Sequence, residues 1–133
     1  MFTTWRWIEM NLPDDAPYHA HIYFKPDQQS TAEELKGRFE AEPDIIFVGV
    51  IQDKSGPHPL PQFEVHFRRQ SLARVRELIL ASGSRALVHP LTEDDLADHT
   101  SLAEWFGEPL DLDLTTLDPP GMNKGIERFG SAA

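Results

Sequence analysis

The fold is decided by the stretch YHAHIYF, residues 18–24, in which polar and apolar side chains alternate. Alternation of residues that favour β-structure predicts a strand with two unlike faces. Every second residue points toward a core, and these are Ala20, Ile22 and Phe24. The residues between them point the other way, and these are His19, His21 and Tyr23. The strand therefore carries two histidines on the face opposite the core.

Two later stretches repeat this alternation and add histidines to the same face. The stretch FEVHFR, residues 63–68, turns three residues away from the core: Glu64, His66 and Arg68. The shorter stretch ALVH, residues 86–89, turns two away: Leu87 and His89. Since the side-chain period of a strand is two, each assignment follows from the apolar residues between these positions.

The segments around these strands predict two helices and one more strand. Ser30 or Thr31 offers an N-cap for a helix that ends before Pro43. Residues 45–51 form a continuous apolar run, which predicts a strand covered on both faces or lying at an interface. Residues 71–80 have helical spacing, and Gly83 stops that helix. The order β-α-β-β-α-β predicts a ferredoxin-like α+β sandwich, with an antiparallel sheet and both helices on one face.

The C-terminal part predicts a helical extension. Residues 92–95 supply a cap and acidic first-turn residues, and residues 96–105 predict a third helix ending near Gly107. Residues 115–133 contain Pro119-Pro120-Gly121 and predict an irregular tail. We find no linker, so residues 1–133 are expected to form a single domain with its core at residues 17–114.

Composition excludes several kinds of site and partner. The chain has no cysteine, so histidine, aspartate and glutamate are the plausible strong metal ligands. A formal net charge of −10 disfavours nucleic acid and anionic membranes as partners. The first residues, MFTTWRWIEM, are too short and polar for a secretory signal, and no run approaches the roughly 18 apolar residues that span a bilayer. We therefore expect a soluble, cytoplasmic protein without membrane or nucleic-acid partners.

The shared face of the three strands could hold a metal ion. In a ferredoxin-like sheet the strand order is four, one, three, two, which makes the histidine-bearing strands neighbours. Neighbouring strands lie about 4.8 Å apart, so imidazoles on them can converge on one ion. Polar residues are also expected on any sheet face that no helix covers, and the pattern alone leaves both interpretations open.

Several stretches taken together resemble the DOPA 4,5-dioxygenase-like family, over roughly residues 17–114. They are YHAHIYF at 18–24, GPHPLP at 56–61, FEVHF at 63–67, LVHPLT at 87–92, DDLADHT at 94–100 and WFGEPL at 105–110. The resemblance implies a ferredoxin-like fold and extradiol cleavage of the catechol ring of L-DOPA, or of a related aromatic, by O2. It also implies a non-haem metal, Fe(II), although a purified sample could hold another divalent metal such as zinc.

For such a reaction the preferred metal ligands are His21, His66 and His89, one from each neighbouring strand, because that set makes a compact triangle with an open side. A set of two histidines and one carboxylate that uses Glu64 is the chief rival, because non-haem Fe(II) oxygenases commonly use that set. His19 and His58 are candidates for proton transfer, since histidine titrates near neutral pH.

Three further residues are candidates for substrate binding, and each also has a plain structural explanation. Tyr23 and Arg68 could orient the substrate, Arg68 by pairing with a carboxylate, and His99 could donate to the site. Phe47 and Ile51 could wall a pocket or a homodimer interface. Two other functions stay open: a non-catalytic module that binds a metal or small ligand, and a domain that pairs with another subunit.

Overall fold

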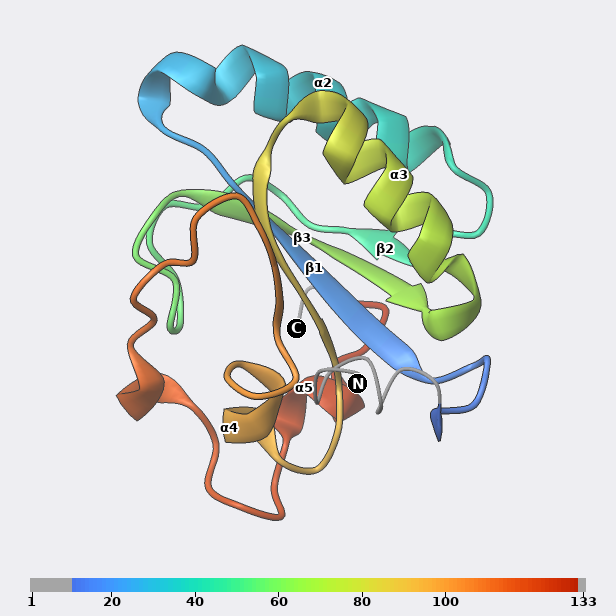
Figure 1. The fold of residues 1–133 in the computed structure, drawn as a ribbon, viewed down its shortest axis with the longest axis vertical. Helices are drawn as coiled ribbons and strands as arrows, with labels where there is room; N and C mark the ends of the chain where they lie inside the picture. The colour runs from blue at the N-terminus through green and yellow to red at the C-terminus, as the bar shows by residue number, and fades with distance from the viewer. Residues whose placement is uncertain (1–10, 132–133) are drawn as a thin grey trace.

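The computed structural model describes residues 11–131 (Figure 1). The main elements, in chain order, are β1 (Pro17–Tyr23), α2 (Gln29–Ala41), β2 (Phe47–Val48), β3 (Gln62–Arg68), α3 (Leu72–Ser82), β4 (Arg85–Pro90), α4 (Asp95–Asp98), β5 (Glu104–Phe106) and α5 (Lys124–Glu127). Short 3-10 turns occupy Pro26–Gln28, Arg69–Ser71 and Leu114–Thr116. The expectation of no secretory signal concerns residues outside the described range. Within that range, no helix combines the length and apolar character needed to cross a membrane.

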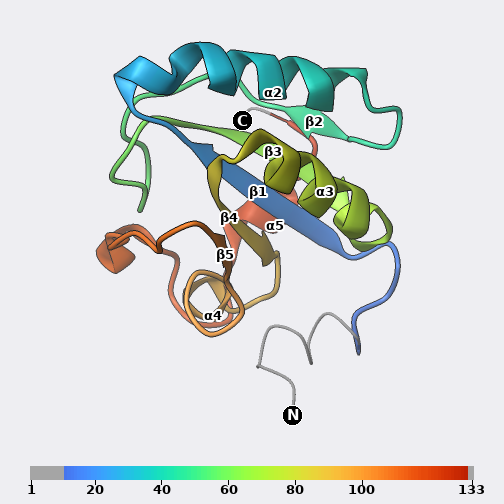
Figure 2. The same cartoon turned by 45° about the horizontal axis from the view of Figure 1, so that its top comes forward.

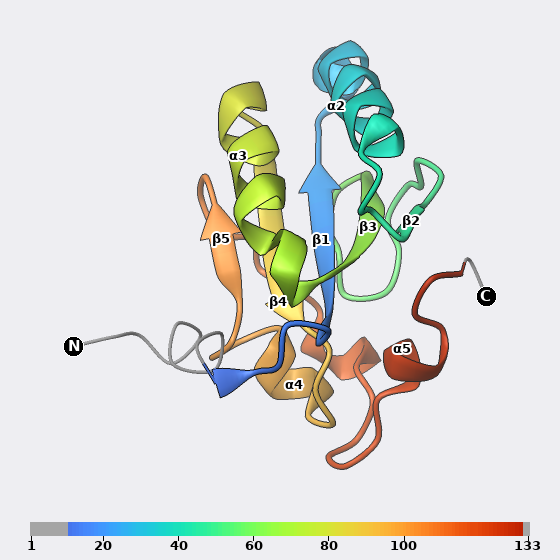
Figure 3. The same ribbon diagram turned by 90° about the vertical axis from the view of Figure 1, so that its right-hand side faces the viewer.

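The strands form a five-stranded antiparallel sheet in the order β2-β3-β1-β4-β5. The predicted neighbour order of the first four strands is confirmed. Helices α2 and α3 lie side by side on one face (Figure 3), whereas α4 and α5 lie on the other side (Figure 2). The α+β class with its two main helices therefore matches the sequence prediction, and the sheet has one face that these helices leave free.

The core lies between the sheet and the two main helices, as the alternation predicts. Ile22, Phe63 and Val65 are fully buried on the helix-facing side of β1 and β3. Phe39 of α2 packs edge-on against Phe63, with ring centroids 6.5 Å apart. Ile79 of α3 is likewise fully buried. Apolar burial thus fixes which face each strand turns to the helices, and so where its histidines point.

Two predicted elements are wrong in extent or type. The strand expected at residues 45–51 is reduced to Phe47–Val48. This segment is the sheet edge, so the flanking Ile46 and Val50 are 44% and 70% exposed instead of covered. The helix expected at residues 96–105 ends at Asp98, and residues 104–106 form β5 instead. Pairing with the edge of β4 overrides the helical spacing there, because Trp105 lies opposite Leu87 and both aromatic residues of β5 favour strands.

The helix ends also differ from the sequence prediction. Helix α2 begins at Gln29, and its N-cap is Gln28 instead of Ser30 or Thr31. The turn Pro26–Gln28 leads directly into the helix, because proline is preset for helical backbone at such a first position. The C-terminal residues expected to be irregular include the single turn of α5.

Core packing of α3 gives a stability prediction. Ile79→Ala should lower the free energy of unfolding by about 2–5 kcal/mol, because it leaves a cavity in a fully buried site. The matched control is the adjacent Leu80→Ala, whose parent side chain is 68% exposed and whose cost should stay within about 0.5 kcal/mol. Denaturant titration of both variants measures the difference. Equal losses would contradict the assignment of the buried face.

Candidate metal centre

All six histidines of the chain gather in one buried cluster on the sheet face that α2 and α3 leave free. Strands and connecting segments supply them: His19 and His21 from β1, His58 from the loop before β3, His66 from β3, His89 from β4 and His99 after α4. His19 lies opposite both His66 and His89 in the register of the sheet. This position makes His19 the centre of the cluster.

His21 and His89 face each other through their Nε2 atoms, which are 3.0 Å apart. The Nδ1 atom of His89 lies 2.8 Å from the Pro90 carbonyl oxygen, which can only accept, so Nδ1 carries the hydrogen. The Nδ1 atom of His21 lies 3.2 Å from Gln62 Oε1, and Gln62 Nε2 donates to Ser55 Oγ at 2.9 Å. Both neutral rings therefore direct a bare Nε2 lone pair at the same point.

Two bare nitrogens at this separation repel each other unless a cation or a proton lies between them. Burial lowers the pKa of His21 well below its ordinary value, and His58 adds to this effect. Burial likewise lowers the pKa of His89, with His99 and His21 acting in the same direction. Protonation of the pair is therefore disfavoured, and a metal ion suits two nitrogen ligands of this kind at about 2.0–2.1 Å from each.

His19 supplies a third nitrogen of the same character. Among the residues that the structure describes, its Nε2 is the one buried side-chain polar atom without a hydrogen-bond partner. Burial is the main cause that lowers its pKa, followed by the charge of His89. The ligand atoms of His19, His21 and His89 all lie within 4.8 Å of one another. An orphaned buried nitrogen beside two facing lone pairs fits a metal centre, because an ion would satisfy all three atoms at once.

His66 is held differently, and the structure does not bring it into this group. Its Nε2 donates to Glu64 Oε2 at 2.9 Å, while its Nδ1 accepts from the Gly130 N–H at 2.9 Å. Its ring stacks on that of His19 at a centroid distance of 4.0 Å. His19, Glu64 and His66 form a second group with ligand atoms within 4.8 Å of one another. Both ring nitrogens of His66 thus already have hydrogen-bond partners.

Glu64 is ionised in this arrangement. Burial acts to raise its pKa, but the hydrogen bond from His66 and the charges of nearby groups, Arg128 among them, outweigh burial and lower it. The Glu64 carboxylate can therefore still serve as the carboxylate of the rival ligand set. Binding a metal through it would break its hydrogen bond with His66.

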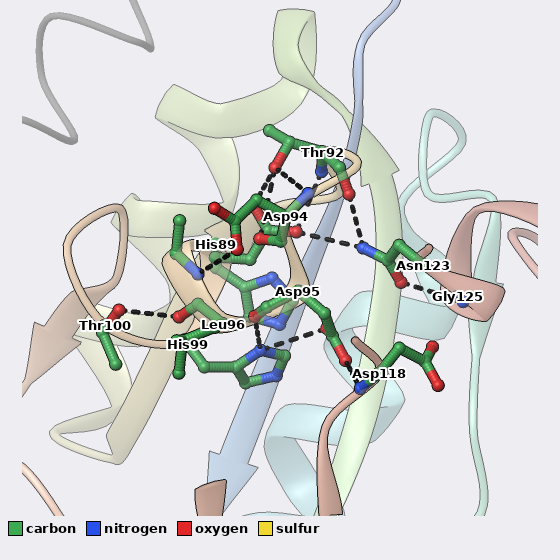
Figure 4. Close-up of polar contacts among 12 residues, drawn as sticks. His89, Thr92, Asp94, Asp95, Leu96, His99, Thr100, Asp118, Asn123 and Gly125 are labelled. Carbon is green, nitrogen blue, oxygen red and sulfur yellow. Dashed lines mark hydrogen bonds and ion pairs between the residues drawn. The ribbon is translucent and has the colours of Figure 1, made fainter. Parts of the chain in front are cut away.

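His99 and Asp95 form a hydrogen-bonded pair beside His89 (Figure 4). His99 Nδ1 donates to the Asp95 carbonyl oxygen at 2.8 Å and lies 3.3 Å from its Oδ1. Asp95 Oδ2 in turn accepts from the Asp118 N–H at 2.9 Å. Burial acts to lower the pKa of His99, but its bonds to Asp95 and the nearby negative charges outweigh burial and raise it. This histidine is the one in the cluster best suited to carry a proton.

His58 is held by Tyr23, whose hydroxyl lies 2.6 Å from His58 Nδ1. Burial raises the pKa of Tyr23, so the hydroxyl keeps its proton and donates a hydrogen bond to Nδ1. Burial also lowers the pKa of His58 to about 3, with further contributions from His99 and His89. His58 is therefore a neutral ring, with its Nε2–H available as a donor. The ligand atoms of His21, His58 and His99 form a third group within 4.8 Å.

Two adjoining cavities open onto the cluster. One, of about 240 Å³, is lined by every histidine except His66, and by Asp95 and part of the C-terminal segment. The other, of about 400 Å³, has an apolar wall that includes Phe47, Val48 and Val50. His19, Glu64 and Arg128 line both cavities. The cluster is thus reached through space of the size that a small aromatic molecule needs.

Two predicted substrate-binding residues lie away from these cavities. Arg68 Nη1 donates to the Asp15 carbonyl oxygen at 2.9 Å, and its guanidinium lies 5.3 Å from the centre of the Phe129 ring. Tyr23 lines neither cavity, and contacts the site through His58. His99, by contrast, lies inside the cluster as predicted.

The sequence analysis missed three residues of the site. Asp95 and His99 are four residues apart, and that spacing at a predicted helix start was a usable signal for their pairing. Gln62 lies two residues before Glu64 on the same face of β3, so alternation could have found it. Arg128 lies in a segment without periodicity, and nothing in the sequence indicated its place.

Comparison with known proteins shows the family to which the chain belongs. Residues 18–116 match the profile of the Dopa 4,5-dioxygenase family. A DOPA 4,5-dioxygenase of Amanita muscaria is 32% identical over 114 residues, covering 75% of this chain and 49% of the relative. An uncharacterized 21.2 kDa protein of Botryotinia fuckeliana is 35% identical over 114 residues, covering 75% of this chain and 62% of the relative.

The chain thus spans only about half to three-fifths of the length of these two relatives. A crystal structure from Nostoc punctiforme, described as a "putative dioxygenase", superposes with a TM-score of 0.72 at 29% identity. The match covers 77% of this chain and 91% of that one. The family profile spans most of the chain, including the strands that carry His19, His21, His66 and His89. This chain therefore belongs to the Dopa 4,5-dioxygenase family.

Proposed function

We propose that this chain is a non-haem Fe(II) extradiol dioxygenase, which cleaves the ring of a catechol, such as L-DOPA or a related aromatic, with O2. Family membership supports the reaction class. The observation that carries the proposal is the pair of facing Nε2 atoms of His21 and His89, 3.0 Å apart, beside the orphaned Nε2 of His19. Neutral imidazoles suit iron and leave coordination positions open. The strand order further supports assigning the core to the ferredoxin-like sandwiches.

The proposed ligands are His19, His21 and His89. The sequence alone favoured His66 in place of His19, but both nitrogens of His66 have hydrogen-bond partners and the Nε2 of His19 has none. Glu64 stays the rival ligand, because it lies in the second group of the cluster. When bound, Fe(II) would supply the site for catecholate and dioxygen and the electron exchange between them.

The protein's own groups would handle the protons. We assign His99 the removal of a catechol hydroxyl proton, because its raised pKa and its bond to Asp95 stabilise the protonated ring. His58 stays neutral, and its Nε2–H would donate a hydrogen bond to a substrate oxygen while Tyr23 fixes its orientation. His19, a proton-transfer candidate on spacing alone, would act as a ligand instead.

Reconstitution tests the function. Protein loaded anaerobically with Fe(II) should consume O2 and form a yellow semialdehyde when L-DOPA or another catechol is added. The same protein loaded with zinc should bind the catechol without turning it over, because zinc has no redox chemistry. Absorbance and an oxygen electrode measure both reactions. Metal-loaded protein that turns over no member of a catechol panel would contradict the enzyme proposal and favour the non-catalytic binding module.

A homodimer also stays a prediction. Ile46 and Val50 are exposed at the β2 edge of the sheet, where a second chain could pair. Sedimentation equilibrium measures the mass directly, and a monomer at all concentrations would contradict the prediction.

A further inference from the structure

One cation near the site has no role in the proposed chemistry. Arg128 is the one lysine or arginine among the described residues that line either cavity. Its guanidinium donates no hydrogen bond to any residue of the described part of the chain. Its charge acts on Glu64, whose pKa it helps to lower. A guanidinium that lines two cavities and donates no hydrogen bond within the described structure can donate to a bound ligand.

The backbone around Arg128 is held in place from both sides. On one side, Asn123 donates to the Thr92 carbonyl oxygen at 2.6 Å and to Asp98 Oδ2 at 3.1 Å (Figure 4). On the other, the Phe129 ring stacks on His66 at a centroid distance of 5.7 Å, and the Gly130 N–H donates to the same histidine. These contacts hold the chain at residue 128 beside the cavities before any ligand binds, which reduces the entropic cost of binding.

The carboxylates around the cavities already have partners. Glu64 accepts a hydrogen bond from His66, and Asp95 accepts from the Asp118 N–H and pairs with His99. Asp118 Oδ2 accepts from the Lys124 N–H at 2.8 Å. None of these carboxylates forms a hydrogen bond with Arg128 in the described structure, so none of them competes with a ligand for its donors.

We propose, resting on the proposed function, that Arg128 binds a carboxylate of the aromatic substrate and makes the site select carboxylate-bearing catechols over neutral ones. The planar guanidinium can donate two parallel hydrogen bonds to a carboxylate. The apolar wall at Phe47, Val48 and Val50 would contact the rest of the molecule. This assigns to Arg128 the role that the sequence suggested for Arg68.

The experiment compares 3,4-dihydroxyphenylacetate with the neutral 4-methylcatechol. Binding is measured by anaerobic calorimetry on zinc-loaded protein, and kcat and KM on the Fe(II)-loaded protein. In Arg128→Gln, the preference for the carboxylate compound should fall about tenfold in both assays, because a charge-assisted hydrogen bond is lost at a partly exposed site. In the kinetic assay this change should come from a higher KM for the carboxylate compound, with kcat unchanged. Salt should weaken binding of the carboxylate compound more in the parent than in this variant.

Lys124→Gln is the matched control. It removes the same charge from the start of α5, whose C-cap is Arg128, but Lys124 lines neither cavity, so the preference should not change. An equal preference in the parent and in Arg128→Gln would overturn the role of Arg128. Failure of the Fe(II) protein to turn over either compound would overturn the proposed function alone, as long as the zinc-loaded parent shows the preference and Arg128→Gln loses it. No binding of either compound would overturn both proposals.

Discussion

His89→Ala should weaken metal binding by more than about a hundredfold, whereas His66→Gln should weaken it by less than that. Loss of a group that only orients a ligand costs about 10–100-fold in affinity, and loss of a ligand costs more. His89 directs a bare Nε2 at its counterpart on His21, 3.0 Å away. Both nitrogens of His66 are engaged by Glu64 and Gly130, so its replacement should act only through its stacking on His19.

Competition titration with a chromogenic chelator, using zinc as the probe metal, measures these affinities. Circular dichroism of the metal-free variants checks that each retains the fold, since the site lies on the sheet face away from the main core. If His66→Gln loses as much metal affinity as His89→Ala does, the ligands are the set that the sequence favoured, with His66 in place of His19. An equal loss in Glu64→Gln would instead favour a carboxylate ligand. Each ligand set therefore predicts a different pattern across the three variants.

The face that carries the histidines was predictable because strand alternation depends on local sequence alone. The apolar residues of β1, β3 and β4 fix which side chains point away from the helices, whatever the neighbouring strands do. The grouping within that face was not predictable in the same way. It depends on register, which places His19 opposite both His66 and His89, and no single strand contains that information.

Long-range contacts also decided the parts that the sequence analysis missed. The Nδ1 atom of His66 has a hydrogen-bond donor only because of Gly130, which is 64 residues away in the chain. Residues 104–106 become a strand because the edge of β4 offers a partner, although their spacing suits a helix. Arg128 comes to the cavities through the bonds of Asn123 and the stacking of Phe129, and neither contact leaves a periodic signal. Local sequence patterns thus predicted which sheet face carries the histidines, whereas tertiary contacts determine which of their nitrogens are left without partners.

Asp95→Asn should lower kcat by about 10²–10⁴-fold, the usual contribution of a positioned proton-transfer group, while metal affinity stays near that of the parent. The carboxylate stabilises the protonated ring of His99, and an amide cannot do so. The pKa of His99 is raised in the parent, so replacing Asp95 should lower it. Activity that requires a neutral His99 rises as pH increases through this pKa, and the rising limb of the kcat profile should therefore move to lower pH in the variant.

The control for that variant is its neighbour, Asp94→Asn. Asp94 caps α4 by accepting from the Ala97 N–H at 3.0 Å, and asparagine caps a helix about equally well. This change removes a nearby charge but leaves the hydrogen bonds of His99 intact. We therefore expect the parental kcat, and a rising limb of the kcat profile at the parental pH. Stopped-flow and steady-state profiles across pH 5–9 measure both variants, a range from about 1.5 units below to about 2.5 units above the ordinary histidine pKa. If Asp95→Asn keeps the parental kcat and limb, proton transfer by the His99 pair is excluded, and Asp95 serves only to hold the Asp118 backbone.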